Sequence, residues 1–388
     1  MVGAIAAIAG CLELGSPPRW TTFRAEGNNQ ASTRLDPGGE LSVAWELDLH
    51  DALGGHDGDL LASSPVADDS TVYVACRLGG SATGSGIVAA DVETGAVRWS
   101  RRIEHEHTGR ERLTHPPVIA GELVTLIGST SGFALAREDG RTRFEFGLPW
   151  TPTTAPGADR FLMALGGPAI AMVDLEEDQG VRWTHPLFES ELHPHNPPTI
   201  LDDRLYVPVG REVLSMRRGD GIVLWREALP DATAVAGAPP LVDGYHLHQR
   251  VRTEEGIDRL IALTRTDRAQ RWAITLGPGI DETPDMPAYR AGQLVAAIDG
   301  ELVSVFVGNG ERAWSASTDV EGRYPTVGGD TVFHLGASTL ETYARRDGDR
   351  LSSITLPGRP APMPNEVVPR DEVALVTRAT RLLGLSRA

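Results

Sequence analysis

The chain of 388 residues contains no lysine, so all 36 of its basic residues are arginine. Against them stand 53 Asp and Glu residues, which give a formal net charge of −17 and a pI near 5.1. Nucleic acids and anionic membrane surfaces are recognised through clustered positive charge. We therefore expect no nucleic-acid partner and no electrostatic binding to a membrane.

Cysteine is also scarce, since only Cys11 and Cys76 are present. Two cysteines exclude a disulfide framework and a metal site built from four thiolates. Cys76 follows the strand-like segment TVYVA, where a small buried thiol is expected. Beyond the N-terminus no stretch approaches the 18 apolar residues of a transmembrane helix.

The first eleven residues, MVGAIAAIAGC, are small and apolar. The segment from Ile8 to Cys11 resembles the lipobox of bacterial-type lipoproteins, in which the cysteine becomes the acylated first residue. This resemblance predicts a signal segment over 1–11, a lipid anchor at Cys11 and an extracytoplasmic location. The alternative is a short N-terminal segment without an anchor, because the apolar stretch is brief and no basic residue precedes it.

A repeat runs through the rest of the chain. Residues 86–99, GIVAADVETGAVRW, contain an alternating apolar run, a tight turn and a strand that carries Trp99, and degraded copies follow. The anchoring residues of the copies are spaced 37 to 47 residues apart, a period typical of propeller blades. They are Trp99, Phe144, Trp183, Trp225, Trp272, Trp314 and Leu351.

A second hairpin lies between successive anchors, and each copy begins near a proline, as in SSPVADDSTVYVAC from Ser63. Proline at the start of a strand loses no needed ladder hydrogen bond. Eight such inner hairpins occur but only seven outer ones, which leaves residues 380–386 and 42–49 as single strands, the latter with Trp45 at the anchor position. Pairing the two would remove two open sheet edges. We therefore predict an all-β fold: a single eight-bladed β-propeller over 41–388 with four-stranded antiparallel blades, closed by its terminal strands and preceded by a tether and lead-in over 12–40.

The most complete copy, Ala89-x-Asp91-x-x-Thr94-Gly95-x-x-x-Trp99, resembles the repeat of the quinoprotein-type (pyrroloquinoline-quinone-like) β-propeller family. Trp20 and Phe23 resemble the lead-in that precedes the first blade of such proteins. The resemblance implies that the anchors dock neighbouring blades, with an indole N–H that needs an acceptor. It does not imply that the repeat itself binds quinone.

The dehydrogenases of this family would imply an adjacent pair of cysteines, a calcium ion held by Glu, Asn and Asp, and an aspartate base. Cys11 and Cys76 are not adjacent, and no calcium loop of EF-hand type is present. No G-x-S-x-G, H-E-x-x-H or P-loop motif occurs either. We predict a protein that is not an enzyme and has no cofactor or metal.

Several polar residues are expected on one propeller face, in the loops that lead into the next blade. Two imidazoles and a carboxylate could hold Zn²⁺, but solvated rim loops are the simpler interpretation. His246 and His248 alternate on a strand, which favours packing between blades over a ligand pair. The candidates for face contacts are His115, His193 and His195 with the nearby His105, His107, Glu189 and Glu191, then Asp281, Glu282, Arg323 and Trp150.

Propellers carry function on loop-built faces, so the fold does not name an activity. The chain is similar in size, blade number and anchoring to the propeller lipoproteins of the outer-membrane barrel-assembly machinery. We predict a monomeric, membrane-anchored scaffold that binds a protein partner through one face. The alternatives are a quinone-type oxidoreductase and a binder of small ligands or polysaccharides at the central channel, for which Tyr324 and Trp150 would supply aromatic surface.

Overall fold

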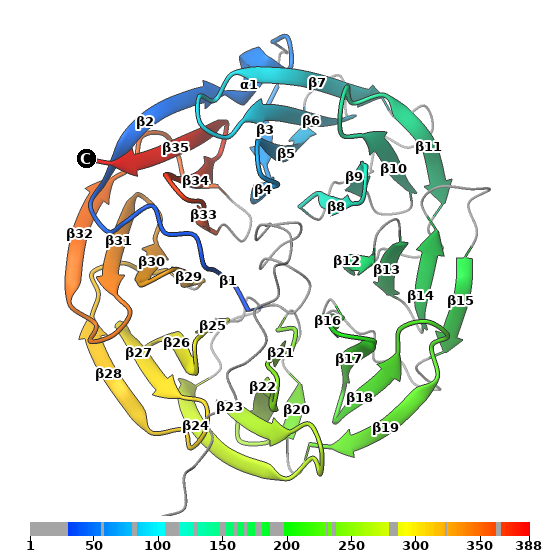
Figure 1. The fold of residues 1–388 in the computed structure, drawn as a ribbon, viewed down its shortest axis with the longest axis vertical. Coiled ribbons are helices and arrows are strands. Elements are labelled where there is room, and N and C mark those ends of the chain that lie inside the picture. Colours follow the sequence, from blue (N-terminus) through cyan, green and yellow to red (C-terminus); the bar gives the residue numbers. More distant parts are fainter. Residues whose placement is uncertain are drawn as a thin grey trace, which may run out of the picture.

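The strands of the protein form sheets that stand around a central axis as the blades of a β-propeller, with almost no helix (Figure 1). This computed structural model describes residues 30–55, 58–79, 84–104, 116–127, 131–147, 153–158, 161–166, 169–174, 181–186, 198–229, 232–234, 238–278, 286–322, 324–361 and 366–388. The all-β class and the propeller architecture expected from the repeat are therefore confirmed.

Among the described residues the strands pair into eight sheets, numbered here in chain order. Sheet 1 contains β3 (Leu60–Ala62), β4 (Val66–Ala67), β5 (Thr71–Leu78), β6 (Gly84–Asp91) and β7 (Val97–Glu104). Sheet 2 contains β8 (Val118–Ala120), β9 (Leu123–Ile127), β10 (Ser131–Ala136) and β11 (Thr142–Gly147). Sheet 3 contains β12 (Thr153–Ala158), β13 (Phe161–Gly166), β14 (Ala169–Asp174) and β15 (Val181–Pro186). Sheet 4 contains β16 (Thr199–Leu201), β17 (Arg204–Val209), β18 (Glu212–Arg217) and β19 (Val223–Ala228).

The remaining sheets follow the same pattern. Sheet 5 contains β20 (Ala232–Ala234), β21 (Leu241–Val242), β22 (His246–Thr253), β23 (Ile257–Thr264) and β24 (Gln270–Pro278). Sheet 6 contains β25 (Ala288–Arg290), β26 (Gln293–Ile298), β27 (Glu301–Phe306) and β28 (Arg312–Ser317). Sheet 7 contains β29 (Thr326–Gly328), β30 (Thr331–Leu335), β31 (Thr339–Ala344), β32 (Arg350–Thr355) and the short β1 (Ser32–Thr33). Sheet 8 contains β33 (Val368–Pro369), β34 (Val373–Arg378), β35 (Arg381–Arg387) and β2 (Leu41–Asp48).

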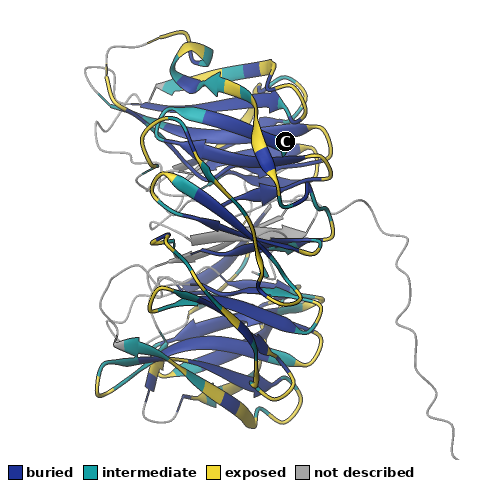
Figure 2. Cartoon of the chain, turned by 90° about the vertical axis from the view of Figure 1, so that its left-hand side faces the viewer, coloured by how far each residue is buried: buried dark blue, intermediate teal, exposed yellow. Residues whose placement is uncertain are grey.

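Burial follows the place of each strand in its sheet. The second strands β5, β30 and β34 are buried on both faces over most of their length, whereas the fourth strands β15, β19 and β32 alternate between exposed and partly buried residues. A middle strand lies between two neighbouring sheets, but a fourth strand at the rim has one face in solvent. Exposed residues accordingly gather at the turns and the rim (Figure 2).

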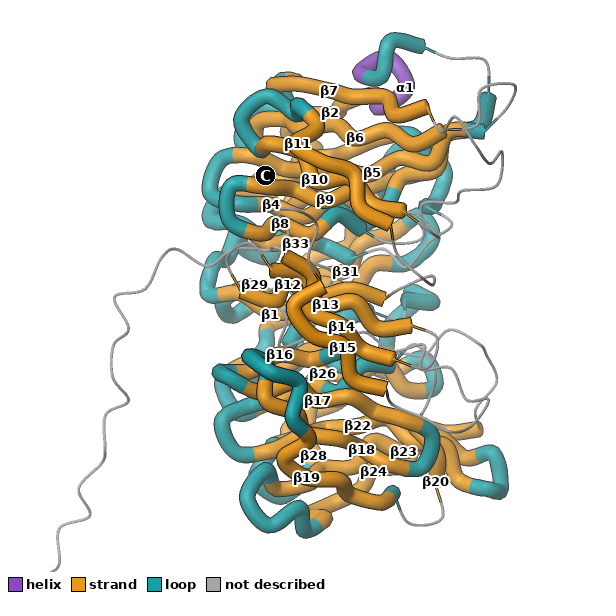
Figure 3. The backbone as a smooth tube through the Cα atoms, turned by 90° about the vertical axis from the view of Figure 1, so that its right-hand side faces the viewer, coloured by secondary structure: helices purple, strands orange, loops and turns teal. Residues whose placement is uncertain are grey.

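The core consists of apolar layers between neighbouring sheets. Ile200 and Leu205 of sheet 4 cluster with Ile170 of sheet 3, and Leu260 of sheet 5 clusters with Leu294 of sheet 6. The strands run across the thickness of the molecule, so turns and connections gather on its two faces (Figure 3). The faces are therefore the surfaces on which loops can vary without disturbing these layers.

Sheet 8 is built from both ends of the chain. Strand β2 pairs antiparallel with β35 from Leu41↔Arg387 to Asp48↔Arg381, and β35 pairs in turn with β34. Arg381 Nη1 also lies 2.5 Å from Glu46 Oε1 across this pairing. The strand pairing expected between residues near 43–49 and 380–386 is thus present.

The part of the predicted lead-in that the structure describes, residues 30–40, is packed on the propeller. Strand β1 pairs in parallel with β29, and the Gln30 amide donates to the Val242 carbonyl oxygen (2.8 Å). After β2 comes the short helix α1 (Leu49–Ala52), whose N-cap Asp48 accepts from the backbone N–H groups of His50 and Asp51. No helix in the described part of the chain is long and apolar enough to cross a bilayer.

Candidate functional site

Five of the predicted anchor tryptophans lie at the seams between sheets, against a glycine in the outer turn of the next sheet. Gly348 has a φ of +81°, and a Cβ there would lie 2.6 Å from the Trp314 ring, so only glycine allows this contact. The same arrangement pairs Trp45 with Gly95, Trp99 with Gly140, Trp183 with Gly221 and Trp272 with Gly310.

Four of these indole N–H groups find an acceptor in the same turns, whereas the buried Nε1 of Trp45 has no hydrogen-bond partner among the described residues. Trp99 Nε1 donates to the Arg137 carbonyl oxygen (2.8 Å), Trp183 to Arg218 (3.0 Å), Trp272 to Val307 (2.7 Å) and Trp314 to Arg345 (2.7 Å). In every case the acceptor lies three residues before the turn glycine. The turn thus fixes both the ring face and the polar edge of the indole.

The seventh anchor, Leu351, lies against Gly39, but it does not occupy the register position of the tryptophans. In sheet 6 the anchor Trp314 pairs with Ser304, and the equivalent pair in sheet 7 is Thr342↔Ser352. Leu351 is the extra residue of the β-bulge and is 41% exposed. The hydroxyl groups of Thr342 and Ser352 instead donate to the Gly39 carbonyl oxygen (2.5 and 2.7 Å). No tryptophan is needed here because the chain enters β2 from residues 38–40 rather than from an outer turn.

A second departure lies at the seam between sheets 4 and 5. The turn position held elsewhere by glycine is Arg268, with a φ of +63°. Trp225 Nε1 is buried and has no hydrogen-bond partner among the described residues. Because an arginine carries a Cβ at this position, Trp225 cannot lie against the turn as the other anchors do.

Sheets 1 and 2 are joined by a buried ion pair at the inner turn. The Asp68 carboxylate accepts from the backbone N–H groups of Ser70 (3.0 Å) and Thr71 (2.9 Å), from the Tyr73 hydroxyl (3.3 Å) and from the Arg137 guanidinium of sheet 2. Burial pushes the pKa of Asp68 up, but these donors and the Arg137 charge together hold it below its usual value of 3.8. Sequence reasoning missed this pair because Asp68 and Arg137 belong to different repeats.

Sheet 5 has an aspartate and an aromatic residue at the corresponding positions, but without the arginine. The strand register makes His248 equivalent to Tyr73. Each residue pairs on one side with the first strand of its sheet, and on the other side with the residue of the third strand that faces the anchor tryptophan. The ring of His248 lies 5.4 Å from that of Trp272, as Tyr73 lies 5.9 Å from Trp99. Asp243 precedes His248 by five residues, as Asp68 precedes Tyr73.

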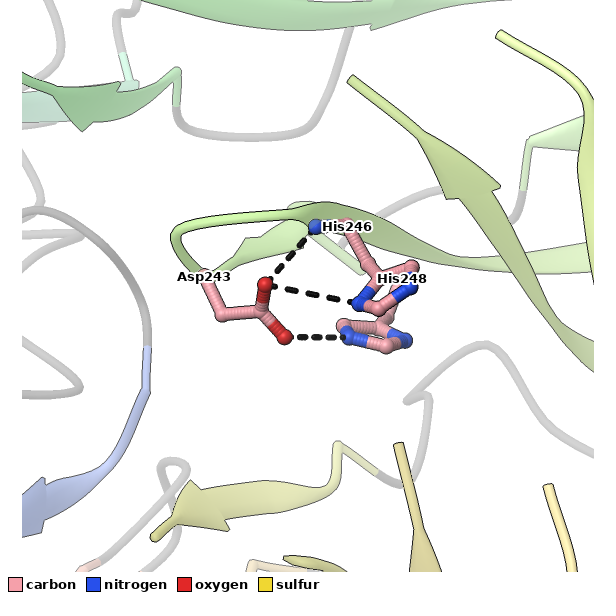
Figure 4. A group of neighbouring side chains, drawn as sticks. All are labelled: Asp243, His246 and His248. Carbon is pink, nitrogen blue, oxygen red and sulfur yellow. Dashed lines mark hydrogen bonds and ion pairs between the residues drawn. The ribbon is translucent and has the colours of Figure 1, made fainter. Parts of the chain in front are cut away.

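Asp243, His246 and His248 form a compact cluster in which both imidazoles point to one carboxylate (Figure 4). His248 Nε2 lies 3.2 Å from Asp243 Oδ2, and His246 Nδ1 lies 3.6 Å from Asp243 Oδ1. The carboxylate also accepts from the backbone N–H groups of Tyr245 (2.6 Å) and His246 (2.7 Å). Sequence reasoning missed the cluster because it considered the two histidines without Asp243, which lies three residues before His246.

The electrostatics of the cluster favour an ionised aspartate beside neutral histidine. Burial raises the pKa of Asp243, but the His248 contact and the two backbone donors outweigh it and bring the pKa to about 2. Burial lowers the pKa of His248, although its bond to Asp243 acts in the opposite direction. His248 is therefore neutral at pH 7 and donates its Nε2–H to Asp243.

Sheet 5 also carries a cavity of about 440 Å³ beside the seam with sheet 4. Its apolar wall includes Leu229, Val251 and Ile261, each at most 5% exposed, and its polar residues include Glu255 and Arg259. This volume is within the range of small-ligand and side-chain pockets.

None of the predicted face contacts can be placed, because all of them lie outside the described residues, as does the predicted lipid anchor Cys11: Trp150, His115, His193, His195, Asp281, Glu282 and Arg323. So do Trp20, Phe23, His105, His107, Glu189 and Glu191. Tyr324 is only 9% exposed, so the expectation that it offers aromatic surface at the channel was wrong. Cys76 is fully buried as expected, and burial raises the pKa of its thiol.

The fold and its repeat define a β-propeller of the pyrroloquinoline-quinone-like repeat class, which confirms the family resemblance. The chain belongs to the family described as outer membrane protein assembly factor BamB, whose profile matches residues 25–162 and 167–388. A search of curated protein sequences found no match.

The solved structures matched by this chain include proteins with different names and sources. Quinohemoprotein alcohol dehydrogenase from Comamonas testosteroni has a TM-score of 0.67 at 13% identity, covering 96% of this chain and 81% of that one. Sqt1 from Saccharomyces cerevisiae has a TM-score of 0.65 at 6% identity, covering 90% and 99%. BamB from Moraxella catarrhalis has a TM-score of 0.45 at 14% identity, covering 89% and 97%. At such identities the similarity concerns the fold alone.

Proposed function

We propose that this protein is a non-catalytic scaffold that binds a protein partner through one face of an eight-bladed propeller. The observation that carries the proposal is membership, over nearly the whole of residues 25–388, in a family described as an outer membrane protein assembly factor. The eight described sheets and the pairing of β2 with β35 support a ring closed by its two chain ends. Such closure leaves a rigid body whose faces are free to carry partner contacts.

The proposed location is extracytoplasmic, with the protein held at a membrane by a lipid on Cys11 and otherwise monomeric. The family description and the lipobox-like sequence before Cys11 support this placement. Full-length protein expressed in a Gram-negative host is expected in the membrane fraction, with a lipid-modified N-terminus by mass spectrometry. A Cys11→Ser variant is expected in the soluble fraction, and equal membrane association of the two proteins would contradict the anchor.

The sheet 5 cavity is the proposed contact for one partner segment. Its apolar wall fits an apolar side chain, and Glu255 in its lining together with the net charge of −17 favours a neighbouring basic residue on the partner. The proposed occupant is thus an apolar side chain flanked by Lys or Arg on an exposed segment of a membrane-associated protein.

Crosslinking in membranes tests the scaffold function. The anchored protein is expected to capture one specific partner, and Ala273→Arg with Glu255→Arg at the cavity should abolish the crosslink. Glu311→Arg, on an exposed turn of sheet 6, is the matched control and should leave it unchanged. Capture that is absent, or equally strong in all variants, would refute this contact.

The competing function is a quinone-dependent oxidoreductase, because enzymes of that kind share this fold. Pyrroloquinoline quinone with Ca²⁺ at 100 times its dissociation constant would stabilise a binding protein by about 2.7 kcal/mol. The scaffold proposal predicts no thermal shift and no dye-linked dehydrogenase activity. A shift accompanied by activity would replace it with the oxidoreductase.

A further inference from the structure

The buried carboxylate of Asp243 lacks the cationic partner that its counterpart in sheet 1 has. Arg137 reaches Asp68 from the position three residues before the turn glycine of the next sheet, and the residue at that position after sheet 5 is Val307. The ion pairs of Asp243 within the described residues are with His246 and His248. Nearby, Arg265 donates to the main-chain oxygens of Asp243 (3.1 Å) and Gly244 (3.0 Å). A buried carboxylate of this kind calls for a cation.

The histidine contacts leave polar atoms unsatisfied. His246 Nδ1 is buried and has no hydrogen-bond partner among the described residues, because its distance of 3.6 Å from Asp243 Oδ1 is too long for a hydrogen bond. A native buried imidazole nitrogen in this position requires an explanation.

The separations between the histidine nitrogens and the carboxylate oxygens also suit a shared metal ion. Zn–N and Zn–O bonds of about 2.0–2.2 Å at the tetrahedral angle separate two ligand atoms by about 3.3–3.6 Å. The observed separations are 3.2 Å for His248 Nε2 and 3.6 Å for His246 Nδ1 from the two carboxylate oxygens. All three side chains offer one ligand atom within 4.8 Å of the others.

We propose that Asp243, His246 and His248 form a binding site for a divalent transition-metal ion. Two imidazoles and one carboxylate select Zn²⁺ or a neighbouring transition metal over Ca²⁺ and Mg²⁺, which prefer oxygen ligands. When the metal binds, the proton of His248 moves from Nε2 to Nδ1, so the imidazole stays neutral and offers Nε2 to the metal beside the ionised Asp243 carboxylate. Water completes the coordination from the side of His246, whose side chain is 14% exposed. The site is independent of the proposed scaffold function.

Zinc stoichiometry tests the site. The chain has 11 histidines, so zinc bound by histidines outside the site must be subtracted. Untagged protein is equilibrated with Zn²⁺ alone and its bound metal is counted by mass spectrometry. The wild type is expected to bind one equivalent more than Asp243→Asn, His246→Gln and His248→Tyr. Loss of an outer-shell partner already weakens metal binding 10- to 100-fold, so loss of a ligand should weaken it about 100-fold or more.

The variants are chosen to keep the fold. Asparagine at 243 retains an oxygen for the backbone N–H groups of Tyr245 and His246, and tyrosine at 248 copies Tyr73 of sheet 1. His334→Gln is the matched control, because His334 is a fully buried histidine in sheet 7 and should leave zinc binding unchanged. Equal stoichiometry and affinity in the wild type and all folded site variants would overturn the proposal.

A measurement on the wild type alone avoids any effect of substitution. Crystals soaked in Zn²⁺ are expected to give an anomalous-scattering peak between Asp243, His246 and His248. Peaks only at other histidines, or no Zn²⁺-dependent thermal shift beyond that of Ca²⁺, would also overturn the site.

Discussion

Sheets 1 and 5 each place an aspartate at the equivalent turn and an aromatic ring against the equivalent tryptophan. The buried carboxylate nevertheless has a different partner in each sheet. In sheet 1 the next sheet supplies Arg137, which contacts Asp68. In sheet 5 the next sheet supplies Val307, and Asp243 faces two histidines instead. The repeat thus preserves the position of the carboxylate, while its counter-charge depends on a residue one blade away.

Sheet 5 also differs at its other seam, the one with sheet 4, which is less regular than the seam between sheets 1 and 2. Trp99 of sheet 1 packs against a turn glycine of sheet 2 and donates to a carbonyl oxygen of the same turn. Trp225 of sheet 4 instead faces Arg268 at the corresponding turn of sheet 5. Sheet 5 also carries the cavity of about 440 Å³. The more regular seam should therefore be the more stable one, and the irregular seam the place where new function can be accommodated.

The largest expected effect is on the regular seam. Trp99→Ala should lower the free energy of unfolding by about 3–5 kcal/mol, as truncation of a large core aromatic does. Trp225→Ala should cost less, because Trp225 is only partly buried and its indole N–H has no partner within the described residues. Chemical denaturation measures both, and a cost below about 1 kcal/mol for Trp99→Ala would contradict its predicted docking role.

The next effect concerns the counter-charge of sheet 1. Arg137→Met should cost about 3 kcal/mol, because it leaves the buried Asp68 carboxylate without its cationic partner. The double variant with Asp68→Asn should recover part of that loss, and urea denaturation of all four proteins gives the coupling. Additive effects would mean that the ion pair does not stabilise this seam.

Acid should diminish the difference between wild type and Arg137→Met. The folded-state pKa of Asp68 is below 3.8, so its contribution to stability is present above that value and is lost as the pH falls through the folded pKa. Without Arg137, fewer contacts oppose the effect of burial, so the pKa of Asp68 is higher in the variant. Its carboxylate is therefore protonated, and the uncompensated charge removed, at a higher pH than in the wild type. The cost of Arg137→Met should therefore shrink between pH 7 and pH 3, and a constant cost would count against an ionised pair.

The smallest effect should make the irregular seam resemble the regular one. Arg268→Gly keeps the left-handed backbone and removes its steric cost, which is about 1–2 kcal/mol for a non-glycine residue. It also removes an ion pair with Glu227 (3.1 Å) that is worth at most about 1 kcal/mol, so a net gain of about 0.5–1 kcal/mol is expected in denaturation. Arg268→Ala loses the ion pair but keeps the strained backbone, and a similar gain in both variants would argue against this explanation.

The periodic features were predictable because each depends only on residues within a single repeat. Alternating strands, turn glycines and anchors at intervals near 42 residues identified the propeller and most of its seams. The error at Leu351 arose where the period fails, since Ser352 holds the anchor position and Gly39 replaces the outer turn. Spacing alone could not reveal that substitution, because residues 39 and 352 are far apart in the sequence.

The sequence by itself determined the all-β class, the repeat and the positions of most anchors, because hydrophobic period and turn chemistry are local properties. Only the tertiary structure decided which side chains meet across a seam. Asp68 with Arg137 and Gly39 with Ser352 are joined by the stacking of sheets that are remote in sequence. The cluster of Asp243, His246 and His248 is local in sequence, but the neighbouring sheet decides that Val307, and not an arginine, occupies the position from which Arg137 reaches Asp68.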